Sequence, residues 1–212
     1  MSDTSPMPVI TGPPPAAPPQ RGPRLVLHAV GLVAVAVVSG LVWWLIRSGG
    51  GVSGEPAAPT PANPLTSGEF SYTVVAGPQT STDCAGNAYG DVANWFVQHP
   101  CERVVRALYT TRSGEARALV SVVVVTMPTA TQAQQLKLIT DTDGTGNVND
   151  LVRDGTASLP GAPSVAGGEY HSKSEGKEVT IVESEFYGDH ADDALLTRIG
   201  SDALRLSEAL RS

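Results

Sequence analysis

The sequence has too few basic residues for a protein that binds nucleic acid. It contains 14 Lys and Arg against 21 Asp and Glu, and the formal net charge is −7. The imbalance grows after Arg47, where 11 Lys and Arg stand against 20 Asp and Glu, a net charge of −9. Because binding to phosphates requires a basic surface, we expect no nucleic-acid partner.

The motifs of common enzyme classes are also missing. Ser164 lies between Gly161 and Gly167 without the tight Gly-x-Ser-x-Gly spacing of a nucleophile elbow. Residues 49–51 are three glycines in a linker, not a phosphate-binding loop. His99 precedes Pro100 at an expected helix end, where a cap is a simpler role than a catalytic base. We therefore expect neither catalytic activity nor a cofactor.

Long apolar runs are absent apart from one, residues 25–46, with the sequence LVLHAVGLVAVAVVSGLVWWLI. As a helix this uncharged run would span roughly 33 Å, which matches a bilayer core of about 30 Å. Trp43 and Trp44 fall where an interfacial aromatic belt belongs. The run predicts a transmembrane helix and a lipid bilayer as partner.

The alternative for this segment is a cleaved signal peptide, whose apolar core would be about 7–15 residues long. The run is longer than that, and no cysteine follows closely enough for a lipoprotein signal. Arg21 and Arg24 precede the segment and only Arg47 follows it closely, which favours a cytoplasmic N-terminus. We therefore predict a single-pass protein of the cell membrane with an extracytoplasmic C-terminal region.

The remaining chain divides by composition into a tail, a linker and one domain. Residues 1–24 contain eight prolines and predict a disordered cytoplasmic tail. Residues 47–68 are rich in glycine and proline and predict a flexible linker outside the membrane. Residues 69–212 have the length of one ordinary domain.

Apolar periodicity within residues 69–212 predicts strands and helices in the order β-α-β-β-α-β-β-α. The first predicted strand is 70–75, ending at Gly77-Pro78. Strands 104–111 and 119–127 are joined by a polar turn over 112–117, and strands 170–174 and 178–186 form a hairpin around 175–177. The predicted helices lie near 90–99, from Thr129 to about 141, and from about 192 to 211. Thr129 and Gln132 have the spacing of a capping box at the start of the second helix. This order predicts an α+β domain, a mainly antiparallel sheet with helices packed on one face. A ferredoxin-like core with additions is one form that it can take.

The two cysteines, Cys84 and Cys101, fall in the region predicted to lie outside the membrane, where a disulfide persists. Bridged Cα atoms lie within about 7 Å, whereas a continuous helix over this separation would hold them roughly 25 Å apart. A bridge therefore requires the first helix to begin near Gly90-Asp91. Free buried thiols or an intermolecular bridge are the alternatives.

Residues 141–150, DTDGTGNVND, form the most suggestive polar stretch. Asp141, Asp143 and Thr145 fall at positions 1, 3 and 5 of a calcium loop, and the stretch resembles an EF-hand or dockerin loop. Val152 stands at position 12, where such a loop has a bidentate acid. The alternative is a helix end followed by a Gly/Asn/Asp turn.

A second acidic stretch, residues 183–193, contains Glu183, Glu185, Asp189, His190, Asp192 and Asp193. Strand alternation places Glu183 and Glu185 on one face, and metal or acid–base chemistry would require both to turn toward His190. The simpler interpretation is that the later acids favour the positive end of the following helix.

The overall layout resembles the uncharacterised single-pass membrane proteins common in actinobacteria, with a Pro-rich tail, one anchor, a linker and a small disulfide-bearing outer domain. That resemblance implies an envelope-facing sensor or assembly partner but no activity and no site residue. We therefore expect a membrane-anchored extracytoplasmic binding or sensor module with a protein or cell-envelope partner. The alternative is a calcium-dependent or hydrolytic envelope protein that uses residues 141–150 or 183–193.

Overall fold

The computed structural model describes residues 63–211. The chain divides into two units, 1–58 and 59–212, and all described residues belong to the second. The predicted tail, the transmembrane segment 25–46 and most of the linker lie outside the described residues. Among residues 63–211, no helix is both long enough and apolar enough to cross a membrane.

Five strands form one antiparallel sheet with the order β1-β2-β3-β5-β4. The elements in chain order are β1 (Thr73–Ser81), α2 (Gly90–Gln98), β2 (Arg103–Ser113), β3 (Ala116–Thr126), α3 (Ala130–Thr140), β4 (Glu169–Glu175), β5 (Glu178–Phe186), α4 (Asp193–Ala203) and the 3₁₀ helix η1 (Leu204–Leu210). The predicted α+β class and antiparallel sheet are confirmed.

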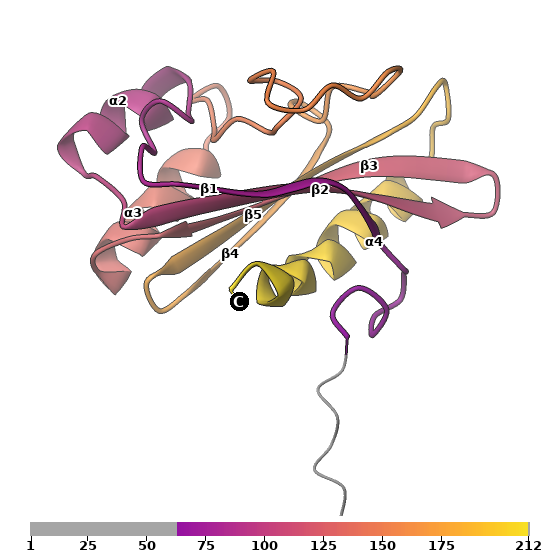
Figure 1. Ribbon diagram of the computed structural model, residues 1–212, viewed down its shortest axis with the longest axis horizontal. Coiled ribbons are helices and arrows are strands. Elements are labelled where there is room, and N and C mark those ends of the chain that lie inside the picture. Colours follow the sequence, from indigo (N-terminus) through magenta and orange to yellow (C-terminus); the bar gives the residue numbers. More distant parts are fainter. Residues whose placement is uncertain (1–62, 212) are drawn as a thin grey trace, which may run out of the picture. The chain divides into compact units, whose positions relative to one another are not determined.

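The helices cover both faces of the sheet, with α2 and α3 on one face and α4 on the other (Figure 1). Successive side chains of β3 point to opposite faces of the sheet, and both sets are mainly apolar, which shows why two layers of helices are needed. Val122 and Val124 pack in the cluster that contains α4, whereas Val123 and Val125 pack with α2 and α3. An apolar run without alternation requires cover on both sides. The expectation that helices lie mainly on one face was therefore wrong.

The sheet contains one of the two split βαβ units of a ferredoxin-like core. A split βαβ unit places a third strand between the two strands that flank its helix. β3 and β4 flank α3 with β5 between them, as in such a unit. β1 and β2 flank α2 but are direct antiparallel neighbours, with Thr80 opposite Val105. The disulfide lies in the connection from β1 through α2 to β2, and this connection brings the chain back beside β1.

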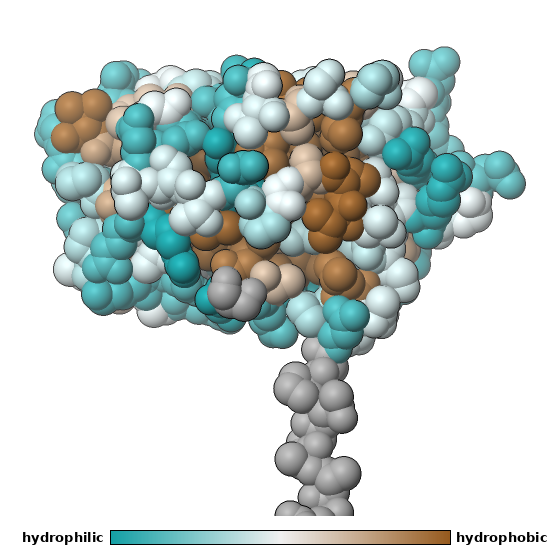
Figure 2. All heavy atoms as spheres, in the orientation of Figure 1, coloured by the Kyte–Doolittle hydropathy of each residue, from teal (hydrophilic) through white to brown (hydrophobic). Residues whose placement is uncertain are grey.

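Strand β1 continues through Gly77-Pro78, so the predicted end of the strand at this dipeptide was wrong. The Gly77-Pro78 peptide is cis, and the pairing with β2 shifts register on both sides of Ala76. Proline is tolerated because β1 is an edge strand. Figure 2 shows apolar side chains gathered in a patch on one face of the molecule. Val74, the second residue of β1, is 43% exposed.

Local signals set the starts of α3 and α4. The Thr129 hydroxyl accepts a hydrogen bond from the backbone N–H of Gln132, as the capping spacing predicts. The Asp192 carboxylate accepts from the N–H of Leu195 at 2.9 Å and caps α4. The helix predicted for the C-terminus changes to 3₁₀ geometry at Leu204, and its apolar face remains buried.

The segment before β1 is fastened to α4 and η1 by hydrogen bonds. The Asp202 carboxylate accepts from the N–H of Phe70 at 3.2 Å, and Arg205 donates to the Phe70 carbonyl at 2.6 Å. The Tyr72 hydroxyl donates to the Ile199 carbonyl at 2.8 Å. The start of the domain is therefore held against its last helix.

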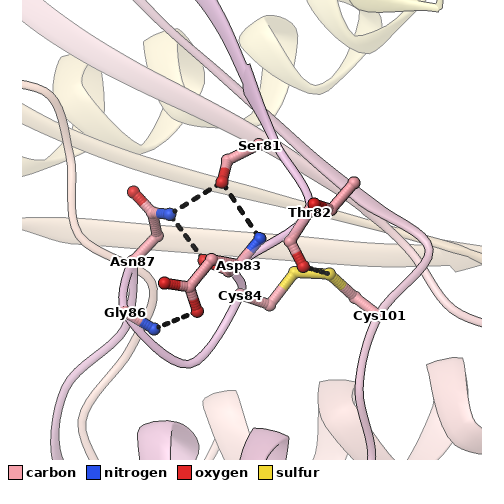
Figure 3. Close-up of a disulfide and its surroundings, with 7 residues drawn as sticks. All are labelled: Ser81, Thr82, Asp83, Cys84, Gly86, Asn87 and Cys101. Carbon is pink, nitrogen blue, oxygen red and sulfur yellow. Dashed lines mark hydrogen bonds between the residues drawn. A yellow bond between two sulfur atoms is a disulfide. The ribbon is translucent and has the colours of Figure 1, made fainter.

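Cys84 and Cys101 form the predicted disulfide, with their Cα atoms 6.1 Å apart (Figure 3). Helix α2 begins at Gly90, as this closure requires. The turn before the helix is ordered by the Ser81 hydroxyl, which accepts from the N–H of Asp83 at 3.0 Å. The side-chain amide of Asn87 donates to the same hydroxyl at 3.2 Å, so Cys84 lies within a loop that is held by hydrogen bonds.

Candidate ligand-binding site

A pocket of about 440 Å³ opens where the start of α2, the end of α3 and the sheet meet. We call it the Glu183 pocket. It is lined by Tyr89, Gly90, Thr140, Thr142, Asp143, Gly144, Gly146, Asn147, Gly167, Gly168, Tyr170 and Glu183. Its size is within the range of small-molecule sites. It joins residues of both acidic stretches that the sequence singled out.

Glu183 forms the buried wall of the pocket. Strand alternation on β5 directs its side chain toward the α2 and α3 face, and only 7% of the residue is exposed. The Asn147 side-chain amide donates to its Oε1 atom at 3.1 Å. Burial raises the pKa of Glu183 to about 7; the hydrogen bond from Asn147 opposes this shift and the nearby Asp150 carboxylate adds to it.

The loop after α3 is positioned by backbone contacts with α2. The Thr145 carbonyl accepts from the N–H groups of Asp91 at 2.7 Å and Val92 at 3.3 Å, so it caps the first turn of α2. Gly146 has a φ of +87°, and a Cβ there would lie 2.2 Å from the Tyr89 carbonyl oxygen. Glycine at 146 therefore allows the loop to lie directly on the start of the helix.

Asp141, the first position of the predicted calcium loop, is already engaged with the protein. Its carboxylate accepts from the Tyr170 hydroxyl at 3.1 Å and the Ser172 hydroxyl at 2.5 Å, and it pairs with Lys137. Burial raises the pKa of Asp141, but these hydrogen bonds outweigh it and the net pKa is lowered. The Thr145 hydroxyl donates to the Ile139 carbonyl at 2.7 Å. Calcium at this loop would have to compete with these partners.

The second acidic stretch is divided between two pockets. Glu183 lies in the Glu183 pocket, whereas Glu185, His190, Asp192 and Asp193 line a neighbouring hollow of about 350 Å³. Asp192 caps α4, as the dipole interpretation of these acids predicts. Within residues 63–211, no group of three or more His, Cys, Asp or Glu side chains is arranged to hold a metal ion.

Sequence reasoning did not assign the two pocket tyrosines to a site. Tyr170 lies directly opposite Glu183 in the β4–β5 pairing, and its hydroxyl donates to Asp141. Tyr89 precedes α2, and the Arg153 guanidinium covers its ring at 3.9 Å. Burial raises the pKa of both tyrosines, so both are neutral hydrogen-bonding groups near pH 7. The predicted hairpin around 175–177 was the available signal, because its register places Tyr170 opposite Glu183.

The chain matches no family model, and no curated protein or solved structure is similar enough to it to count as a relative. Functional conclusions therefore rest on the chain's own residues. The Glu183 pocket combines one buried carboxylate, neutral hydroxyl and amide groups, and glycine backbone. These groups suit the binding of a small polar molecule.

Proposed function

We propose that residues 69–212 form an extracytoplasmic binding module, held at the cell membrane by a helix over residues 25–46, that binds its ligand in the Glu183 pocket. The module has no catalytic activity of its own. A flexible linker over residues 47–68 would give the domain freedom to reach a ligand or an envelope partner.

The observation that carries this proposal is the burial of Glu183 at the wall of an open pocket. Burying a carboxylate is unfavourable unless it is paired, and among the described residues the side-chain carboxylate of Glu183 has one hydrogen-bond partner, the Asn147 amide. Groups held in an unfavourable environment in a cavity are typical of functional sites. A ligand that pairs with Glu183 would remove part of this cost.

The disulfide supports the extracytoplasmic location. Disulfides persist in oxidising compartments and are rare in the cytosol. The disulfide between Cys84 and Cys101 is buried and joins the segments before and after α2, so it has a structural role. This agrees with the orientation that Arg21 and Arg24 favour.

The test is a binding screen on the full chain in mild detergent. Amino acids, amines, sugars and wall-derived peptides are titrated against the wild type, Glu183→Gln and Glu115→Gln. Glu115 is an exposed residue between β2 and β3 and does not line the pocket. We expect at least one compound to bind the wild type and Glu115→Gln alike, and Glu183→Gln at least tenfold more weakly. If no compound shows this difference, the proposal is wrong.

One observation favours a second candidate, acid–base catalysis. A carboxyl group with a pKa of about 7 can donate and accept protons near neutral pH, and Asp143 supplies a second carboxylate in the same pocket. Hydrolysis of a wall glycan or peptide that is lost in Glu183→Gln and retained in Glu115→Gln would replace the binding module by an enzyme.

A further inference from the structure

We propose that the ligand of the Glu183 pocket is a small organic cation that carries an ammonium or guanidinium group. This inference rests on the proposed binding function and adds the chemical class of the ligand. It follows from the charge of the lining, the position of Glu183, the orientation of α3 and the size of the pocket.

The charged side chains that line the pocket are both acidic. Asp143 and Glu183 contribute carboxylates, and no Lys, Arg or His is among the described lining residues. Lys137 and Arg153 do not line the pocket but contact residues that do or that adjoin it, and the charge of Arg153 lowers the pKa of Glu183. Lys137 pairs with Asp141, and Arg153 lies over the Tyr89 ring. An anionic ligand would meet two carboxylates and no basic side chain among the described lining residues, which opposes its binding.

Glu183 has hydrogen-bonding capacity left for a ligand. A carboxylate has two oxygens that accept about four hydrogen bonds, and the Asn147 amide uses one of these positions, on Oε1. The residue is 93% buried, since 7% of it is exposed, so water solvates it poorly. A cationic donor would restore the missing interactions with a charge-assisted hydrogen bond.

The end of α3 adds negative potential from the backbone. Thr140 is the last residue of α3, and both Thr140 and Thr142 line the pocket. The C-terminal end of a helix carries partial negative charge and favours cations. The N-terminal end of α2 also borders the pocket, and its partial positive charge would oppose a cation. This positive potential is reduced, because the Thr145 carbonyl already accepts hydrogen bonds from the first N–H groups of α2.

The size and the ligands available favour an organic cation over a metal ion. The pocket holds about 440 Å³, far more than a single ion occupies. Within residues 63–211, no group of three acidic, His or Cys side chains is arranged to coordinate a metal. The five lining glycines leave backbone exposed beside two tyrosines, a surface that accepts hydrogen bonds and contacts a short hydrocarbon chain.

The inference implies a pH dependence, because Glu183 must be ionised to pair with the cation. The groups around it are Asp143, Asp150 and Arg153 from the loop after α3, Tyr89 before α2 and Tyr170 on β4. With a pKa of about 7 for Glu183, roughly one tenth of the carboxyl is ionised at pH 6 and nine tenths at pH 8. Affinity for a cation should therefore rise about tenfold over this interval.

The experiment compares three five-carbon probes that differ only in their end groups. Isothermal titration calorimetry on the full chain in mild detergent uses 1,5-diaminopentane, 1,5-pentanediol and glutarate at pH 6 and pH 8. We expect the diamine alone to bind at pH 8 with a sub-millimolar Kd, and about tenfold more weakly at pH 6. Glu183→Gln should abolish this binding, Asp143→Asn should weaken it, and Glu115→Gln should leave it unchanged.

Two results would overturn the inference, and they have different meanings for the proposed function. If the diol binds as well as the diamine and Glu183→Gln weakens both, the ligand class is wrong and the binding function stands. If the diamine does not bind at pH 8, the organic cation is excluded. The earlier screen then decides whether the pocket binds another class or none. Circular dichroism of each variant verifies that the fold is retained.

Discussion

Replacing Glu183 by glutamine should stabilise the domain at neutral and alkaline pH and have little effect at low pH. The pKa of Glu183 rises from its ordinary value of 4.5 to about 7 on folding, because burial disfavours the charged form. Below pH 4.5 the carboxyl is protonated in both states and costs nothing. Between pH 4.5 and 7 the folded state holds more protons than the unfolded state, so the free energy of unfolding falls as pH rises. Each pKa unit corresponds to about 1.4 kcal/mol, which gives a total cost of about 3 kcal/mol above pH 7.

The assay is urea denaturation of the fragment 59–212, with its disulfide intact, at pH 4.5, 6 and 8. Other carboxyls also make the stability of the wild type depend on pH. Folding lowers the pKa of four of them, so each stabilises the folded state once the pH is high enough to ionise it. They are Asp141, Asp154, Glu175 and Asp202. Their contributions cancel in the difference between the wild type and Glu183→Gln. We expect that difference to grow from near zero at pH 4.5 to about 3 kcal/mol at pH 8 in favour of the variant. A difference that does not change with pH would refute the reasoning.

Three further predictions test the topology, the bridge and the packing of α4. Protease added to intact spheroplasts should degrade residues 69–212 and leave a small fragment with the tail and anchor; protection of this region would reverse the predicted orientation. Replacing Cys84 and Cys101 together by alanine should lower the unfolding free energy by about 3 kcal/mol in urea denaturation, because the bridge spans 17 residues; a loss below about 1 kcal/mol would contradict the chain-entropy estimate. Gly200→Ala should cost about 1–3 kcal/mol by overpacking, since a Cβ at Gly200 would lie 2.4 Å from the His171 ring. As a control, Ser201→Ala at the exposed neighbouring position should change the unfolding free energy by no more than about 0.5 kcal/mol. Equal effects of the two variants would show that Gly200 is not in tight contact with His171.

Sequence reasoning located the elements whose signals are local. The Thr129 and Gln132 spacing fixed the start of α3, and the geometry of a disulfide fixed the start of α2 near Gly90. The two hairpins followed from polar turns between β-rich runs. Each of these signals depends on residues that are close in the chain, or on a covalent constraint.

The errors arose where distant segments decide the outcome. Pro78 suggested the end of a strand, but an edge strand with shifted register accommodates it. The apolar run of β3 indicated that helices or loops cover both faces of the sheet, yet the helices were predicted mainly on one face. The periodicity of a helix shows which of its sides is apolar but not which face of the sheet that side packs against.

The candidate site was predicted only in fragments. Glu183 and Asn147 are 36 residues apart in the sequence, and their hydrogen bond depends on the loop after α3 resting on α2. Glu183 was grouped with His190, which instead lies edge-on to Phe186 beside the neighbouring hollow. Strand alternation gave the correct face of β5 but not the segment packed against that face.

The attachment of the segment before β1 to α4 and η1 determines how the domain would respond to mechanical load. Tension applied through the chain before Asn63 reaches the Phe70 contacts with Asp202 and Arg205 before it reaches β1. The load then passes through the Tyr72 hydroxyl into α4 at Ile199. Phe70 and Tyr72 are also buried in the cluster that contains α4, so the load must break these hydrogen bonds and expose two aromatic side chains before it reaches the eleven-residue ladder between β2 and β3. A pull on the chain before Asn63 would therefore extend the segment before β1 by a few residues and leave the Glu183 pocket, on the opposite face of the sheet, intact.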